Sequence, residues 1–202
     1  MMIKNIIFDI GNVLLGFEYW SFFESFGYDE ETMERLAKAT VLSSQWNELD
    51  RGVLSYQEVL QRFTENAPEL ESVIYRTFEN LKGLLSRYEY AVPWIKELKS
   101  KGYKVYYLSN FFRKAEVDCA ETMDFLPYMD GGILSYRDKV TKPDRAIYQL
   151  LLSRYGLKAE ESVFLDDTEK NIVGAKKEGI HGIVFRNKEQ TCEELRKLGV
   201  DA

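Results

Sequence analysis

The sequence predicts an α/β protein: a doubly wound parallel sheet interrupted by one inserted helical segment. Three observations indicate this fold. An apolar run at residues 6–8 ends at Asp9, as expected of a buried strand that leaves the sheet through a sharp loop. Residues 18–85 carry helical periodicity and capping signals but no convincing strand. From residue 92 onward, helical and apolar extended segments alternate, which is typical of parallel strands joined by right-handed crossovers.

The helical block begins directly after the first strand. Ser55 and Glu58 have the Ser-x-x-Glu spacing of a capping box, which predicts a helix start. A block of this length far exceeds a strand-to-helix loop of about 2 to 6 residues, so we expect an inserted cap. The predicted division is a core of residues 1–16 and 86–202 and a cap of residues 17–85. The expected cap helices cover residues 19–26, 30–39, 44–49, 56–63 and 68–81.

The remainder of the chain alternates between strands and helices. Gly102 and Gly156 would stop two helices, and Pro143 suits the first turn of another. His181 precedes the last strand, at the edge of the sheet opposite the strand exits, so we expect a structural role for it. The expected strands cover residues 103–108, 131–134, 162–165 and 182–185, and the expected helices cover residues 92–100, 114–123, 143–155, 169–178 and 188–197.

Composition excludes several classes of protein. A chain of 202 residues with 45% hydrophobic and 14% aromatic side chains is long and apolar enough to bury a core. Its net charge of −6 argues against a nucleic-acid partner, and no apolar run is long enough for a membrane partner. Cys119 and Cys192 lack any metal-binding spacing and indicate reduced thiols in a cytoplasmic protein. We expect a monomer and leave a dimer open.

Polar side chains follow four of the predicted strands. The carboxyl ends of parallel strands meet at one edge of a sheet, which we call the rim, and ligands bind there in open α/β folds. Taken singly, each group has a plainer explanation as a turn cap or a solvated lysine. Four groups at equivalent places favour a reactive site. The rim groups are Asp9, Ser109, Asn110, Lys142, Asp166 and Asp167.

Phosphoryl transfer is the chemistry that these groups suit. An ionised carboxylate can attack phosphorus, but a phosphate dianion must first have its charge neutralised. Lysine and serine can bind phosphate oxygens, and Mg²⁺ prefers carboxylate and carbonyl oxygens. Asp9 and Asp167 would be unfavourably close without a cation, so the sequence implies a bound metal.

Four segments also carry a resemblance to a known family. In order and context they resemble the four motifs of the haloacid dehalogenase-like (HAD) hydrolase superfamily, whose core is Rossmann-like and whose first type of helical cap (C1) matches the helical block. Within it, the chain is most similar to the sugar-phosphate phosphatase branch near α-D-glucose-1-phosphate phosphatase, which also begins Phe-Asp-x-Gly-Asn-Val. The segments are Phe8-Asp9-Ile10-Gly11-Asn12-Val13, Leu108-Ser109-Asn110, Thr141-Lys142-Pro143 and Phe164-Leu165-Asp166-Asp167-Thr168-Glu169-Lys170-Asn171.

The resemblance implies a role for each rim residue. Asp9 would be the nucleophile that forms an aspartyl-phosphate, and Lys142 would stabilise the charge on it and on the transferring group. Ser109 and Asn110, with Lys142, would hold phosphate. The Mg²⁺ ligands would be Asp9, the Gly11 carbonyl and Asp167, with Asp166 either a further ligand or a neighbour of the site. Asn171 replaces a second acidic residue of the last motif.

One position departs from the family pattern. Most phosphatases of the superfamily carry a second Asp two residues after the nucleophile, which moves the proton of the leaving group, whereas this chain has Gly11. Turnover could then be slow, could use a leaving group that needs little protonation, or could use another acid. We expect a Mg²⁺-dependent phosphatase of a small phosphorylated metabolite, specifically a sugar phosphate. The alternatives are a non-catalytic or weakly active phosphometabolite-binding protein and, less favoured, a 2-haloacid dehalogenase.

Residues near the start of the cap are candidates for the substrate pocket. Asn12, Phe17 and Trp20 could line it, although aromatic side chains at helical spacing belong more often to the core. Residues 48–52 are either a loop that faces the substrate or a solvated turn.

Overall fold

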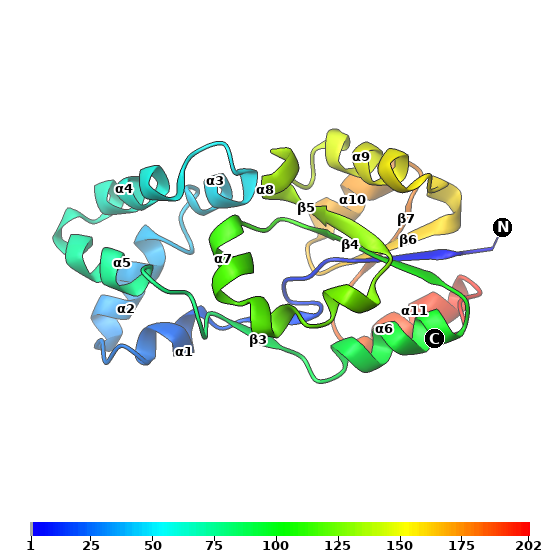
Figure 1. Ribbon diagram of the computed structural model, residues 1–202, viewed down its shortest axis with the longest axis horizontal. Helices are drawn as coiled ribbons and strands as arrows, with labels where there is room; N and C mark the ends of the chain where they lie inside the picture. The colour runs from blue at the N-terminus through cyan, green and yellow to red at the C-terminus, as the bar shows by residue number, and fades with distance from the viewer. Residues whose placement is uncertain (1) are drawn as a thin grey trace.

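The computed structural model describes residues 2–202 and contains a five-stranded parallel sheet (Figure 1). The strand order is β5-β4-β1-β6-β7, so β1 is central and its exit is flanked by those of β4 and β6. This arrangement confirms the predicted α/β class. The strands are β1 (Asn5–Phe8), β4 (Lys104–Ser109), β5 (Gly131–Leu134), β6 (Ser162–Asp166) and β7 (His181–Val184).

Helices cover both faces of this sheet, which explains why β1 is buried along its whole length and apolar from Ile6 to Phe8. Ile6 and Phe8 pack on one face with the apolar sides of α6 and α11, whereas Ile7 packs on the other with α9 and α10. In Figure 1, α9 lies above the sheet and α6 and α11 lie below it. The helices are α6 (Ala91–Ser100), α9 (Arg145–Tyr155), α10 (Glu169–Lys177) and α11 (Lys188–Lys197).

Strand register brings the predicted rim together. Phe8 lies opposite Leu165 of β6, and the next residue, Asp9, continues the ladder by donating its backbone N–H to the Leu165 carbonyl at 2.8 Å. Asp9 therefore lies level with Asp166. On its other side, β1 pairs with β4, which ends at Ser109. The carboxyl ends of the three central strands thus form one edge, as parallel topology requires.

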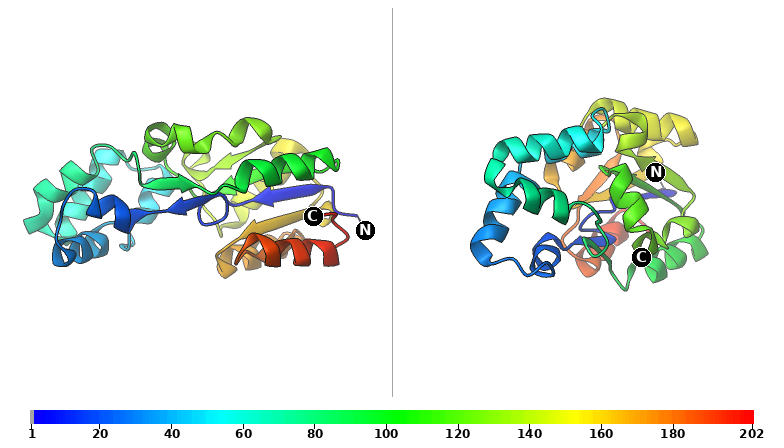
Figure 2. Two further views of the ribbon diagram at one scale, coloured as in Figure 1. Left: turned by 90° about the horizontal axis from the view of Figure 1, so that it is seen from below. Right: turned by 60° about the vertical axis from the view of Figure 1, so that its left-hand side comes forward.

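Five helices, α1 to α5, lie together beyond this edge, and we call them the cap (Figures 1 and 2). Two predicted helix starts are confirmed: the Asp29 carboxylate accepts the Thr32 N–H, and Ser55 and Glu58 form both bonds of a capping box. The helices are α1 (Tyr19–Glu24), α2 (Glu30–Ala39), α3 (Trp46–Arg51), α4 (Tyr56–Asn66) and α5 (Glu71–Thr77), the last preceded by a short 3₁₀ turn (Pro68–Leu70).

A two-stranded antiparallel ribbon connects the sheet to the cap. β2 (Leu15–Phe17) pairs with β3 (Leu85–Arg87), and Phe17 lies opposite Leu85. This ribbon was not expected from the sequence, because strands of three residues leave almost no periodic signal. The ribbon lies where the chain was predicted to enter and leave the cap, and the division at residues 17–85 stays a prediction.

Most other elements also differ from their predicted bounds, and three of them illustrate the differences. The helix predicted over 143–155 begins at Arg145, with Pro143 in the turn before it. The helix predicted over 114–123 ends at Asp118, where the Asp118 carboxylate accepts the Leu81 N–H, and a 3₁₀ turn follows. The strand predicted over 182–185 runs over 181–184. Among the described residues, no helix is long and apolar enough to cross a membrane. The remaining elements are α7 (Arg113–Asp118), α8 (Ser135–Asp138) and the 3₁₀ turns Ala120–Met123, Leu126–Tyr128 and Ala159–Glu161.

Candidate active site

An ion-paired cluster lies at the exit of β1. The Lys142 ammonium contacts Asp9 Oδ1 at 2.8 Å and Asp166 Oδ2 at 2.7 Å. All three side chains are buried. Because a buried charge is stable only when it is paired, this one ammonium is the counter-charge of both carboxylates. The structure thus brings together the residues predicted as nucleophile and as charge stabiliser.

Both carboxylate oxygens of Asp166 accept hydrogen bonds from neighbouring groups. Its Oδ1 accepts the Thr168 N–H at 2.8 Å and the Asn171 side-chain N–H at 3.0 Å. Its Oδ2 accepts the Lys142 ammonium and, at 3.0 Å, the same Asn171 amide. A carboxylate has about four acceptor positions, so Asp166 has none left over. Of the two roles that the sequence analysis left open for Asp166, the geometry favours that of a neighbour that positions Lys142.

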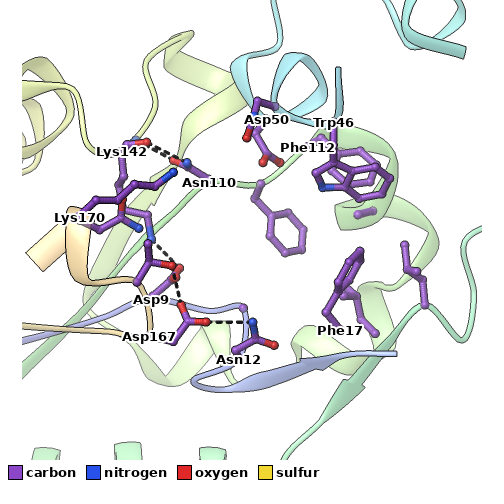
Figure 3. Close-up of a pocket in the computed structure, with 18 residues that line it drawn as sticks. Asp9, Asn12, Phe17, Trp46, Asp50, Asn110, Phe112, Lys142, Asp167 and Lys170 are labelled. Atoms are coloured by element: carbon purple, nitrogen blue, oxygen red, sulfur yellow. Dashed lines mark hydrogen bonds and ion pairs between the residues drawn. The ribbon is translucent and has the colours of Figure 1, made fainter. Parts of the chain in front are cut away.

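Asp167 is half-buried and faces the opening of the site. The Asn12 side-chain amide donates to Asp167 Oδ2 at 2.9 Å, and the Thr168 hydroxyl donates to Oδ1 at 3.2 Å (Figure 3). Asn12 has a positive φ of 55°, a conformation that asparagine tolerates better than most residues. The sharp turn after β1 thereby connects the nucleophile loop to the last motif.

The Asn110 side chain was expected to hold phosphate, but it bonds to the backbone of Lys142. Its amide donates to the Lys142 carbonyl at 3.1 Å, and its side-chain oxygen accepts the Lys142 N–H at 2.7 Å. The side chain therefore holds the backbone at Lys142 and is not free to bind phosphate, which leaves the backbone N–H of Asn110 for that purpose. Ser109 is buried beside Asp9, and its hydroxyl lowers the pKa of the Asp9 carboxyl.

Burial and charge act in opposite directions on the cluster. Burial raises the pKa of Asp9 to about 7, with a further contribution from Asp166, while Lys142 opposes the shift. Burial alone would lower the pKa of Lys142, but Asp9 and Asp166 together raise it above its ordinary value. Lys142 is therefore charged at neutral pH, and additional positive charge near Asp9 would favour the ionised carboxylate that a nucleophile requires.

The acidic groups are arranged so that they could hold a divalent cation. One carboxylate oxygen from each of Asp9, Asp166 and Asp167 lies within 4.8 Å of the others. Asn171 supports this fit independently, because its buried side-chain oxygen has no hydrogen-bond partner among residues 2–202. A water molecule held by a cation would satisfy that oxygen. The donor set of carboxylates and amide oxygens suits a hard cation.

A cavity of about 340 Å³ lies between the rim and the cap. Asp9, Gly11 and Asp167 form part of its floor. The opposite wall is aromatic: the Trp46 ring lies 5.6 Å from that of Phe17 and 5.4 Å from that of Phe112, between ring centroids (Figure 3). The cavity therefore has a charged side and an apolar side.

A profile of the haloacid dehalogenase-like hydrolase family matches residues 3–179. The chain belongs to this family. It is 26% identical over 195 residues to the sesquiterpene phosphatase astK of Aspergillus oryzae, a match that spans 96% of both chains. It is 25% identical over 187 residues to a phosphorylated carbohydrates phosphatase of Thermotoga maritima, covering 88% of this chain and 82% of the other.

Solved structures agree on the fold of this hydrolase. A HAD family enzyme of Bacteroides thetaiotaomicron, in complex with magnesium and inorganic phosphate, has a TM-score of 0.68 at 21% identity, over 94% of this chain and 98% of that one. An L-2-haloacid dehalogenase of Xanthobacter autotrophicus has a TM-score of 0.66 at 19% identity, over 100% and 85% of the two chains. The superfamily assignment is confirmed, whereas the closer similarity to α-D-glucose-1-phosphate phosphatase stays a prediction.

Of the three residues predicted for the substrate pocket of this hydrolase, the cavity contains two. Asn12 and Phe17 line it. Trp20 does not line it: its ring packs edge-on against Tyr19 of the same helix, α1, and stays 38% exposed. Trp46 of α3 supplies the indole ring of the wall instead.

Two charged residues of the cavity were missed as individual site residues. Lys170 follows the acidic pair in the last motif and reaches the cavity from the first turn of α10. Asp50 comes from the segment 48–52, which the sequence left open between a substrate-facing loop and a solvated turn, and which forms the end of α3. Asp50 is buried and lines the cavity, so it does not lie in a solvated turn, and its contact with a substrate stays a prediction.

A close contact between cap and core fixes the end of α3. The Asp50 carbonyl accepts the Ser135 hydroxyl at 2.6 Å, and the same hydroxyl oxygen accepts the Phe111 N–H at 2.9 Å. At Gly52, which has a φ of 65°, a Cβ atom would lie 2.7 Å from the Tyr136 carbonyl oxygen. Only glycine combines this conformation with such a close approach. The position of Asp50 over the rim therefore rests on packing between distant parts of the chain.

Proposed function

We propose that this hydrolase is a phosphatase of small phosphate monoesters, and that Asp9 attacks the phosphorus atom to form an aspartyl-phosphate. The observation that carries the proposal is the buried cluster of Asp9, Lys142 and Asp166 at the floor of a cavity that also presents Asp167. A nucleophilic carboxylate beside a fixed ammonium is suited to a dianionic substrate. The phosphatase names of both relatives support the same reaction.

The residues of the chain divide the work as follows. Lys142 holds Asp9 in place through its ammonium and offers the same charge to the phosphoryl group as it transfers. Asp166 and Asn110 fix Lys142 from its side chain and its backbone. The Ser109 hydroxyl, the Asn110 backbone N–H and Lys142 would bind the remaining phosphate oxygens. Lys170, exposed at the mouth of the cavity, adds positive charge that attracts an anionic substrate.

The cation of this site is proposed to be Mg²⁺. Asp9, Asp167 and the Gly11 carbonyl would hold it, because Asp166 has no acceptor position to spare. When bound, it supplies positive charge that favours ionised Asp9 and offsets the charge of the phosphate. The Bacteroides thetaiotaomicron enzyme, which shares the fold, is in complex with magnesium and inorganic phosphate.

The substrate is proposed from the two sides of the cavity. A sugar phosphate agrees with the motif resemblance and with the carbohydrate phosphatase among the relatives. The aromatic wall of Phe17, Trp46 and Phe112 favours a second candidate, a phosphate ester with an apolar organic group. The sesquiterpene phosphatase among the relatives is consistent with that candidate. Dehalogenation is less favoured, because it gives no use to Asp167, whose carboxylate lies within 4.8 Å of that of Asp9.

Phosphate release tests the proposed function directly. Wild type should release phosphate with Mg²⁺ from at least one member of a panel of sugar, polyol, aryl and isoprenoid phosphates. Asp9→Asn keeps the shape of the side chain but removes the nucleophile, so kcat should fall by about 10⁴-fold or more. Saturable binding of phosphorylated compounds without turnover, unchanged in Asp9→Asn, would instead favour the binding protein. Halide release from 2-haloacids in EDTA would favour the dehalogenase.

A further inference from the structure

One buried ionisable side chain of the cavity has no hydrogen-bond partner in the part of the chain that the structure describes. Asp50 is only 8% exposed, yet its carboxyl accepts no hydrogen bond from any residue between 2 and 202. Figure 3 shows this carboxyl aimed into the cavity from the cap side, facing the floor that Asp9 and Lys142 form. Every other buried carboxylate of the cavity region is held by a neighbouring donor. A buried and unpaired carboxyl is costly, so its retention calls for a use.

The proposed reaction lacks a group that such a carboxyl could supply. Gly11 has no side chain, so the nucleophile loop offers no acid for the leaving oxygen. Three carboxylic side chains line the cavity: Asp9, Asp50 and Asp167. Asp9 is the proposed nucleophile, and Asp167 is hydrogen-bonded to Asn12 beside the proposed cation. Asp50 alone is both unpaired and on the side of the cavity that the organic part of the substrate would occupy.

We propose that Asp50 is the general acid and general base of the phosphatase reaction, in place of the side chain that Gly11 lacks. The assignment rests on the proposed function and names the residue that moves the proton. It places the two halves of the chemistry on different parts of the fold. The core supplies the nucleophile and the cap supplies the proton.

The two steps balance with Asp50 as the only proton carrier. In the first, an Asp9 oxygen bonds to phosphorus, the bond from phosphorus to the leaving oxygen breaks, and the Asp50 proton passes to that oxygen to give the alcohol. In the second, ionised Asp50 takes a proton from water as the water oxygen bonds to phosphorus. The bond from phosphorus to the Asp9 oxygen then breaks, which releases hydrogen phosphate and restores ionised Asp9 and protonated Asp50.

The electrostatic surroundings suit this role. Burial raises the pKa of Asp50 to about 7, with Asp9 adding to the shift and Lys142 opposing it. A group that titrates near the working pH can both give and accept a proton. Asp167 and Lys170 are the other charged groups of the cavity, and Lys170 belongs to the exposed mouth. The Ser135 bond to the Asp50 carbonyl fixes the backbone from which the carboxyl extends.

The test compares two substrates that differ in their need for an acid. Nitrophenyl phosphate releases a stabilised anion, whereas glycerol phosphate releases an alkoxide that must be protonated. The variants are Asp50→Asn, which keeps size and shape, and Glu48→Gln, the same change on the same helix at a residue outside the cavity. A third variant, Asp50→Asn with Gly11→Asp, restores a carboxyl to the usual position. No atom lies within 4 Å of a Cβ built on Gly11, so a side chain can start from this position without a clash.

We expect Asp50→Asn to lose about 10²-fold or more in kcat on glycerol phosphate. On nitrophenyl phosphate it should release one nitrophenolate per enzyme in a burst, followed by slow turnover, because the first step needs no acid and the second still needs a base. Glu48→Gln should match wild type. The double variant should regain turnover of glycerol phosphate, which a misfolded protein could not do.

The contrary results are equally specific. Equal losses on both substrates without a burst would assign Asp50 a structural role and overturn the proposal. If Asp50→Asn does not fold, the pH profile of kcat is measured on wild type with both substrates. The kcat for glycerol phosphate should fall on the alkaline side of the profile, while the kcat for nitrophenyl phosphate does not. Parallel profiles would overturn the proposal. An active wild type matched by Asp50→Asn overturns this assignment alone, whereas a wild type without phosphate release overturns the proposed function with it.

Discussion

The charged side chains on the two sides of the active-site cavity differ in whether they are paired. On the rim, the buried charges of Asp9, Lys142 and Asp166 neutralise one another at 2.7 to 2.8 Å. On the cap side, Asp50 is buried without a partner, among aromatic rings. Paired charges hold one geometry, whereas an unpaired carboxyl beside apolar surface is free to interact with whatever enters. In the proposed function, the core would carry out the phosphoryl chemistry and the cap would contact the organic part of the substrate.

The largest effect is expected where the rim depends on a single charge. Lys142→Met leaves Asp9 and Asp166 buried without a counter-charge, and breaking a buried pair in this way costs about 3 to 5 kcal/mol. The kcat should fall as well, because Lys142 is the residue proposed to stabilise the charge of the transferring phosphoryl group. Urea denaturation at pH 7 measures the stability. Lys170→Met, at the exposed lysine of the same cavity, should change stability by about 0.5 kcal/mol or less. Equal losses in the two variants would contradict the pairing of the rim.

The next effect is a pH dependence of the free energy of unfolding, which comes from Asp50 on the cap side. Because the pKa of Asp50 is raised to about 7 in the folded protein, its contribution to stability is fully present below about pH 4 and is lost as the pH rises to about 7. Asp50→Asn lacks this loss. The variant should therefore gain stability relative to wild type between about pH 4 and 7, by on the order of 3 kcal/mol, and stay constant above that range. Parallel curves of unfolding free energy against pH would show that Asp50 is not held in an apolar site.

A smaller effect separates the two candidate substrates. Trp46→Leu removes the flat ring at the centre of the aromatic wall and should raise KM for an isoprenoid or aryl phosphate about tenfold, since aromatic anchors dominate apolar contacts. KM for a sugar phosphate should change less. Trp20→Leu is the matched control, because that ring lies outside the cavity. Equal changes for both substrate classes would indicate that the wall has no part in selecting the organic group.

The rim was predictable from sequence, and the cap side largely was not. Polar residues that directly follow apolar strands must meet at one edge once the sheet is parallel, so Asp9 and Asp167 could be placed without coordinates. Lys142 lies eight residues beyond the end of β5, and the motif resemblance placed it on the rim. The wall depends on how α3 docks. The Ser135 hydroxyl bonded to Asp50 and the contact at Gly52 join segments about 85 residues apart, and no local pattern encodes them.

The roles of two kinds of side chain also depended on packing that the sequence did not predict. Trp20 and Trp46 are both tryptophans at the start of cap helices, and only packing decides which ring faces the rim. Asn110 lies where the motif places it, yet its amide holds the Lys142 backbone instead of facing a ligand. Sequence position placed Asn110 on the rim, but the hydrogen-bond partner of its side chain depended on the path of a loop 32 residues away.

In the proposed reaction, Asp9 becomes covalently phosphorylated while the cap supplies the proton. The most direct measurement is to quench Asp50→Asn during turnover of nitrophenyl phosphate, reduce the acyl phosphate with borohydride, and map the peptide that contains residue 9 by mass spectrometry. We predict homoserine at position 9, in higher yield than from wild type, because hydrolysis of the intermediate is slowed. An unmodified Asp9 in a variant that is turning over substrate would contradict the account.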